Sequence, residues 1–175
     1  ILSKKKEIIV NDKSYKRLNV LKENIRRLKF NPKLYNRDMF NYDTNVKYDF
    51  IILDIPCSAV GTIRKNPEIF FKRDGPEIKN LIKTQQKMLE KASTMINKNG
   101  IILYMVCSFL NIETFKQINF FLKNNRNFKI NYFYLKKDNK EHKQFVKKNI
   151  LFTLPTKFKG FHIDGYFAVY LKKTY

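Results

Sequence analysis

The segment YDFIILDIPCS, residues 48–58, decides the fold class. Its first six residues are almost entirely apolar, which is typical of a parallel strand that is covered on both faces. Asp54 ends this strand, and a loop with Pro56 and Cys57 follows. A second segment, IILYMVCS at residues 101–108, repeats the pattern with six apolar residues before a cysteine and a serine. Two such strands predict an α/β domain built around parallel strands.

The flanking segments alternate between helical and strand patterns. Ser14 is a good N-cap for a helix whose apolar residues recur at helical spacing as far as Leu28. Pro76 suits the first turn of a long helix to about residue 96, and Asn99-Gly100 is expected to end it. The other predicted elements are strands at 7–12, 34–37, 128–135 and 166–171, a helix around 115–122 and a solvated loop at 136–148. This order predicts a mostly parallel sheet closed by two late strands.

Composition limits the class of protein. The 175 residues suit one domain, and 43% hydrophobic with 15% aromatic residues can build a core. The 36 Lys and Arg against 15 Asp and Glu give a net charge of +21, which indicates a polyanionic partner. The abundance of Lys, Asn, Ile, Tyr and Phe also fits an AT-rich genome, so compositional drift is the alternative explanation of the charge. No apolar run reaches the length of a membrane span, and the first ten residues lack the features of a signal peptide. We therefore expect a soluble protein of a reducing compartment.

Polar residues follow four of the predicted strands. They are Asp12, Asp38, Asp54 with Cys57, and Cys107 with Ser108. Because the carboxyl ends of parallel strands meet at one edge of a sheet, we expect all four groups to line one crevice.

Each of these residues has a structural and a functional interpretation. A cysteine on a strand is usually a small buried hydrophobe, but two at strand ends also suit nucleophilic chemistry in an electropositive field. Asp12 either marks a helix entry or binds ribose hydroxyls, and Asp38 either caps the next turn or contacts an adenine. Asp54 could bind the edge of a cytosine. The two cysteines and two histidines match no zinc spacing, and a reducing compartment disfavours a disulfide.

Four short motifs give the chain a resemblance to the Sun (Fmu) family of RNA cytosine-5 methyltransferases, nearest to its RsmB type. The family's Asp-Ala-Pro-Cys-Ser is DIPCS at 54–58, and its Gly-x-Ile/Val-Arg-Arg-x-Pro-Asp is GTIRKNPE at 61–68. Its Thr-Cys-Ser after a strand is Val-Cys-Ser at 106–108, and its Asp-Gly-Phe-Phe is Asp-Gly-Tyr-Phe at 164–167. The resemblance implies a Rossmann-like class I methyltransferase fold over nearly the whole chain.

The resemblance also implies roles for the candidate residues. Cys107 would be the nucleophile that adds to C6 of a target cytosine, and Cys57 would help to release the product. Asp54 would bind the base around N3 and N4 and border the cofactor. Asp12 and Asp38 match the family's contacts to the ribose and adenine of S-adenosylmethionine. The implied reaction is methylation of cytosine C5 in RNA of the 16S ribosomal type through a covalent Cys–C6 adduct, without a metal.

The implied partner is RNA, with no membrane, and we expect a monomer in a bacterial-type cytoplasm or an organelle. A set of basic residues is expected to contact its phosphates. These are Arg64, Lys65, Lys72 and Arg73, together with Arg17 and Arg26.

The chain also departs from the family pattern. The Gly-rich cofactor motif and the strand before it are missing, so residues 1–175 are expected to be an N-terminally incomplete catalytic domain. The family's Leu-Pro-Glu-Glu-Asn is Leu-Asn-Ile-Glu-Thr at 110–114, which we interpret as drift. These losses leave a catalytically degenerate RNA-binding remnant as the alternative. DNA cytosine-5 methyltransferases fit less well, because they carry Pro-Cys-Gln where this chain has Pro-Cys-Ser.

Overall fold

The computed structural model describes residues 7–42, 45–71, 77–132 and 140–175. The chain divides into two compact units, Ile1–Thr44 and Asn45–Tyr175. Each unit is described by itself below.

The first unit is a small strand–helix–strand arrangement. It contains β1 (Ile9–Asn11), α1 (Tyr15–Arg27), β2 (Lys33–Tyr35) and the short 3-10 helix η1 (Met39–Asn41). Ser14 caps α1 as predicted, since its side chain accepts a hydrogen bond from the Arg17 backbone N–H. Strands β1 and β2 are parallel neighbours, with Asn11 opposite Tyr35. Asp12 and Asp38 therefore follow the same ends of two adjacent strands.

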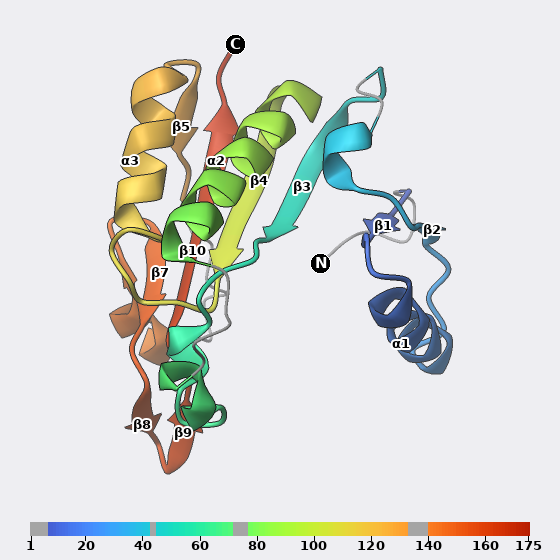
Figure 1. Ribbon diagram of the computed structural model, residues 1–175. Helices are drawn as coiled ribbons and strands as arrows, with labels where there is room; N and C mark the ends of the chain where they lie inside the picture. The colour runs from blue at the N-terminus through green and yellow to red at the C-terminus, as the bar shows by residue number, and fades with distance from the viewer. Residues whose placement is uncertain (1–6, 43–44, 72–76, 133–139) are drawn as a thin grey trace. The chain divides into compact units, whose positions relative to one another are not determined.

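The second unit is built on a mixed sheet (Figure 1). Among its described residues, the strands run in the order β3 (Tyr48–Asp54), β4 (Ile96–Val106), β10 (Tyr166–Lys173), β7 (Ile150–Thr153) and β6 (Val146–Lys147). Strands β3 and β4 are parallel, while β10 runs antiparallel to β4, to β7 and to β5 (Phe128–Ile130). The predicted α/β class is confirmed. Strands β3 and β4, which precede the two cysteines, are neighbours within the sheet.

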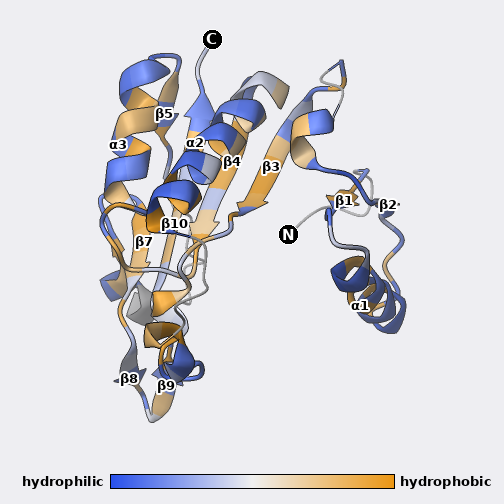
Figure 2. Ribbon diagram, in the orientation of Figure 1, coloured by the Kyte–Doolittle hydropathy of each residue, from blue (hydrophilic) through white to orange (hydrophobic). Residues whose placement is uncertain are grey.

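Two helices, α2 (Ile78–Met95) and α3 (Phe115–Asn124), lie on one face of this sheet (Figure 1). Their apolar sides face the strands and their polar sides face outward (Figure 2). The core between the layers includes Leu89, Ile102, Tyr104, Ile118 and Phe167, each at most 2% exposed. Burial of these side chains holds β4 and β10 at the centre of the unit.

The structure corrects several boundaries. Helix α2 ends at Met95, within one residue of the predicted end, but β4 begins directly at Ile96 and not at residue 101 after Asn99-Gly100. Asn99 instead takes a left-handed conformation, with φ of 63°, within the irregular start of β4. The strand predicted at 128–135 is limited, where described, to β5. On β3, Phe50 and Ile52 are 38% and 53% exposed, whereas Leu53, whose side chain lies on the opposite face of the strand, is 4% exposed.

The late part of the chain holds more strands than predicted. The expected loop at 136–148 contains the 3-10 helix η4 (Lys140–Phe145) and strand β6 within its described part. Strand β7 follows directly, and β8 (Thr156–Phe158) with β9 (Phe161–Ile163) forms a separate hairpin. These strands are only two to four residues long and have lysines within or beside them, so no alternating apolar pattern is visible in the sequence.

Candidate active site

The two cysteines meet at the carboxyl ends of β3 and β4. Asp54 lies opposite Met105 in the parallel register, so Cys57 and Cys107 leave the sheet side by side. Their Sγ atoms are 3.3 Å apart, within hydrogen-bonding distance for sulfur. Both side chains are partly buried and both are free thiols. The predicted convergence of these two residues is thus observed.

This contact makes the two thiols unequal. A hydrogen bond from Cys57 lowers the pKa of Cys107 to about 7, against opposing contributions from burial and from the carboxylates of Asp54 and Glu113. The same contact, together with burial, raises the pKa of Cys57 far above its ordinary range. One sulfur can therefore be a thiolate near neutral pH while its neighbour stays protonated, which is the arrangement that a nucleophilic cysteine needs.

Asp54 ends β3 with an exposed side chain. It lies close enough to Cys107 to raise the pKa of that thiol, and Tyr166 at the start of β10 lies close enough to both cysteines for their charge to act on its pKa. Burial, followed by the negative charges of Asp54 and Cys107, raises the pKa of Tyr166. The cysteines, an exposed carboxylate and an aromatic ring therefore share one edge of the sheet.

A buried carboxylate that the sequence analysis did not single out lies beneath the cysteines. Glu113 is 0% exposed. Its Oε1 accepts from the backbone N–H of Ser58 at 2.9 Å and from Gln85 Nε2 at 3.0 Å. Its Oε2 accepts from the hydroxyls of Ser58 and Ser108, each at 2.6 Å. The signal in the sequence was that Glu113 occupies the position of the second Glu in the family's Leu-Pro-Glu-Glu-Asn, inside the segment interpreted as drift.

Two glycines bring the remaining motifs to the same place. Gly61, in the 3-10 helix η2 (Val60–Thr62), donates its N–H to the carbonyl of Cys107 at 3.0 Å. Its own carbonyl accepts from the N–H of Gly165 at 2.7 Å. A Cβ at Gly61 would overlap the Gly165 carbonyl, so only glycine permits this approach. The GTIR and Asp-Gly motifs therefore pack directly against the Cys107 loop.

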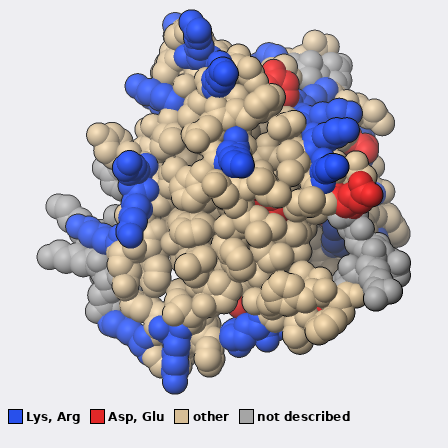
Figure 3. All heavy atoms as spheres, turned by 60° about the vertical axis from the view of Figure 1, so that its left-hand side comes forward, with Lys and Arg blue, Asp and Glu red and all other residues tan. Residues whose placement is uncertain are grey.

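The predicted RNA-contacting residues do not all lie in the same surroundings. Arg64 and Lys65 both pair with Asp164, at 3.4 Å and 2.6 Å. Lys72 and Arg73 lie outside the described residues, just after the 3-10 helix η3 (Pro67–Phe70). On the face in Figure 3, basic side chains stand in separate groups and acidic ones are few. Positive charge is therefore spread over this face and not gathered into one patch.

The first unit holds the two other predicted carboxylates. Asp12 makes a two-point ion pair with Arg17, at 2.9 Å through each oxygen, and accepts from the Ser14 backbone N–H at 2.7 Å. The Arg17 hydrogen bond is the main reason that the pKa of Asp12 is lowered. Asp38 accepts from the Phe40 backbone N–H at 2.9 Å and so caps η1. The structure brings these two residues together, but it does not place them relative to the cysteines.

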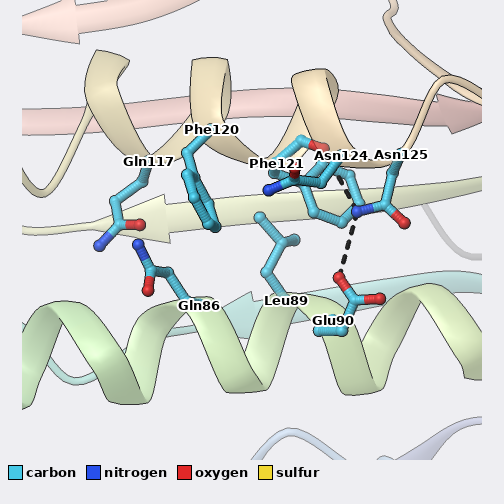
Figure 4. A pocket seen from close by; sticks show the side chains of 8 residues that line it. All are labelled: Gln86, Leu89, Glu90, Gln117, Phe120, Phe121, Asn124 and Asn125. Atoms are coloured by element: carbon cyan, nitrogen blue, oxygen red, sulfur yellow. Dashed lines mark hydrogen bonds between the residues drawn. The ribbon is translucent and has the colours of Figure 1, made fainter.

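A small pocket lies away from this chemistry, between α2 and α3 (Figure 4). Its wall includes a hydrogen bond of 3.1 Å from Asn125 to Glu90. The lining residues are Gln86, Leu89, Glu90, Gln117, Phe120, Phe121, Asn124 and Asn125. None of them is a thiol or a predicted site residue, so we interpret the pocket as a packing groove.

Among the described residues, no cluster of three or more His, Cys, Asp or Glu side chains is arranged to hold a metal ion. None of the helices in that part of the chain is both long and apolar enough to span a membrane.

Comparison with known sequences connects this site to a family. Residues 1–172 match the family described as 16S rRNA methyltransferase RsmB/F. The ribosomal RNA small subunit methyltransferase B of Pasteurella multocida is 42% identical over 83 residues, 47% of this chain and 19% of that protein. The enzyme of the same name from Photorhabdus laumondii is 32% identical over 127 residues, 71% of this chain and 30% of that protein. The chain thus spans less than a third of the length of these relatives.

Comparison with solved structures supports the fold. NSun6 from Pyrococcus horikoshii, solved with SFG, superposes with a TM-score of 0.76 at 24% sequence identity. The match covers 97% of this chain and 42% of that one. The shared fold is Rossmann-like. Together with the family match over 172 residues and the convergence of its motifs on one cysteine pair, these findings show that the chain belongs to the RsmB/F family of 16S rRNA methyltransferases.

Proposed function

We propose that this chain is catalytic machinery for transferring a methyl group from S-adenosylmethionine to C5 of a cytosine in small-subunit ribosomal RNA. The observation that carries the proposal is the pair of thiols 3.3 Å apart, with the pKa of Cys107 lowered to about 7. Membership of the RsmB/F family and the names of its relatives support the class of reaction and the RNA substrate.

Covalent catalysis suits this pair because C5 of a cytosine is a poor nucleophile on its own. The Cys107 thiolate adds to C6, forming a C–S bond and leaving C5 electron-rich. S-adenosylmethionine, when bound, supplies the electrophilic methyl group. Once Cys107 is bonded to C6, it is no longer a thiolate that raises the pKa of Cys57, so Cys57 can release its proton to solvent. After C5 gains this methyl, the Cys57 thiolate takes the C5 proton, the C6–S bond breaks and Cys107 leaves as a thiolate.

Asp54 and Tyr166 suit the handling of the target base. An exposed carboxylate can accept from the exocyclic N4 amino group and, when protonated, can donate to N3. Tyr166 offers a partly exposed aromatic face beside the thiols, on which an unstacked base can pack. The target must leave any helix to reach these groups, so loops and single-stranded RNA are the expected substrates.

The first unit carries groups that fit the polar end of the cofactor. Ribose hydroxyls and the adenine amino group are hydrogen-bond donors, and carboxylates are acceptors with several lone pairs. Asp12 and Asp38 follow adjacent parallel strands, where α/β folds bind nucleotides. Three hydrogen bonds already engage Asp12, which leaves one carboxylate lone pair for a ribose hydroxyl. We therefore assign the ribose to Asp12 and the adenine to Asp38.

Covalent trapping with the complete protein tests this proposal. The Cys57→Ala variant should accumulate a protein–RNA adduct that survives denaturing electrophoresis, because methylation proceeds and elimination does not. The Cys107→Ala variant should form no adduct and no product. Bisulfite sequencing of ribosomal RNA should locate the methyl group at C5 of a cytosine in the wild-type reaction.

Two results would refute the assignment. Methylation at the normal rate by Cys107→Ala would refute the assignment of Cys107 as the nucleophile. A methyl group found on the ribose or on N4 would refute methylation at C5 while leaving the family membership intact. Comparison of both variants with wild type by circular dichroism controls for unfolding.

A further inference from the structure

Among the described residues of the second unit, the fully buried carboxylate of Glu113 contacts both of the loops that carry a cysteine. Ser58 directly follows Cys57, and Ser108 directly follows Cys107. Both serine hydroxyls donate to the same oxygen of Glu113, each at 2.6 Å. One carboxylate thus bridges the loop after β3 and the loop after β4 at the residues adjacent to the thiols.

Glu113 itself is held in place from several directions. Its backbone carbonyl accepts from the buried hydroxyl of Tyr104 at 2.7 Å, and its N–H donates to Leu110 at 2.9 Å. Gln85 Nε2 donates both to Glu113 and to the carbonyl of Pro56, at 3.0 and 3.1 Å. Strand β4 and helix α2 therefore fix the carboxylate, and the serines take their positions from it.

The network extends into the second helix. Gln117 on α3 donates to the side-chain oxygen of Gln85 at 2.9 Å and to the carbonyl of Ile82 at 3.2 Å. Among the described residues, every buried side-chain nitrogen and oxygen has a partner. A fully satisfied buried network of this kind is rigid, because moving one member leaves its neighbours unpaired.

We propose that Glu113 is a positioning residue that sets the spacing of Cys57 and Cys107 by clamping the serine after each cysteine. The role depends on the reach and acceptor geometry of its side chain, not on its charge. This inference rests on the proposed function only for its catalytic consequence, since the spacing of the thiols is measurable without RNA or cofactor.

Two substitutions distinguish the effect of the side-chain length at position 113 from the effect of its charge. Glu113→Gln removes the charge but keeps the length, so its amide oxygen can accept from the Ser58 N–H and Gln85 while its NH2 donates to the two hydroxyl oxygens. Glu113→Asp keeps the charge but is one methylene shorter, so it cannot hold both serines and Gln85 at once. The matched controls are Glu90→Gln and Glu90→Asp, at an exposed carboxylate in the groove between α2 and α3.

The readout is the pH profile of Cys107 alkylation by iodoacetamide in the complete protein, followed by peptide mass spectrometry. Glu113→Asp should move the midpoint upward from about 7 toward 9.0, because separated loops lose the Cys57 hydrogen bond. Glu113→Gln and both Glu90 variants should keep a midpoint near the wild-type value. Where RNA methylation is measurable, Glu113→Asp should lower kcat by on the order of tenfold to a hundredfold with little change in KM for RNA.

The outcomes are distinct. A folded Glu113→Asp protein with an unchanged midpoint would overturn the proposal, and so would a Glu113→Gln midpoint displaced as far upward as that of Glu113→Asp. If Glu113→Asp fails to fold, Ser108→Ala, which cuts one serine contact, must raise the midpoint, and an unchanged midpoint then overturns the proposal. Failure of the wild-type protein to methylate RNA would refute the proposed function alone.

Discussion

Removal of the Cys57 thiol should change how Cys107 titrates. The Cys57 S–H is the largest contribution that lowers the pKa of Cys107. In Cys57→Ala burial becomes the largest remaining influence and raises that pKa, with smaller upward contributions from Asp54 and Glu113 and a downward one from a backbone hydrogen bond. The pKa of Cys107 should therefore rise from about 7 toward its ordinary value of 9.0. In Cys57→Ser a hydroxyl can still donate, so we expect an intermediate value.

The size of the effect on reactivity follows from two opposing factors. At pH 7 about half of Cys107 is thiolate in the wild type, against about 1% when its pKa is 9.0. A thiolate of higher pKa is more nucleophilic, and a Brønsted coefficient of 0.4–0.5 makes this gain about eightfold over two pKa units. Alkylation of Cys57→Ala at pH 7 should therefore be about sixfold slower than that of wild type. Above about pH 8 the order should reverse, because the variant thiolate is then sufficiently populated.

Iodoacetamide rates between pH 5.5 and 10, measured on the Cys107 peptide by mass spectrometry, provide the assay. Cys107→Ala is the control that shows which signal belongs to Cys57. The crossing of the two profiles is the decisive feature, since a general loosening of the loop would raise the rate at every pH. Coincident midpoints for wild type and Cys57→Ala would refute the idea that Cys57 activates its neighbour.

Three further changes probe the same site. Gly61→Ala should destabilise the folded protein by about 1–3 kcal/mol in denaturant titrations, because its Cβ meets the Gly165 backbone and no rotamer relieves that contact. Its methylation rate should fall as the Cys107 loop shifts, and an unchanged stability would contradict the close approach. Tyr104→Phe should cost about 1–2 kcal/mol because it leaves the buried carbonyl of Glu113 unpaired, and a neutral result would indicate that water replaces the hydroxyl. Lys65→Ala should reduce the slope of log Kd for RNA against log salt by about 0.7 if this side chain contacts a phosphate, and an unchanged slope would leave it as an ion-pair partner only.

The sequence predicted the parts of the fold that depend on local pattern. Strand β3 was predicted with the bounds that the structure has, and Ser14 was identified as the cap of α1. The pairing of the two cysteines followed from one general rule, that neighbouring parallel strands present their carboxyl ends at the same edge. The family membership is confirmed, whereas the roles assigned to Cys57 and Cys107 stay predictions.

Other features depend on contacts that are distant in the sequence, and these were not predictable. Glu113 matches the family's second Glu, but it was passed over because its neighbours at 111, 112 and 114 depart from the family pattern. The sequence also does not show its partners Gln85 and Ser58, which lie 28 and 55 residues away. The start of β4 was misplaced because Asn99-Gly100 is a strong local stop signal, yet pairing with β3 begins at Ile96. Pairing in the sheet overrides local propensity there.

The construction of the site shows why local substitutions can affect chemistry without affecting the fold. Pairing of β3 with β4 brings the two thiols to one edge, but a parallel register alone fixes positions only as far as Asp54 and Met105. Beyond that point the loops are held by Glu113 on one side and by the Gly61 contact to the Cys107 carbonyl on the other. A thiol pKa that depends on a hydrogen bond of 3.3 Å is sensitive to small shifts of either loop. Changes at Glu113 or Gly61 should therefore alter the titration of Cys107 before they unfold the sheet, and this order of effects is what separates a positioning role from a purely structural one.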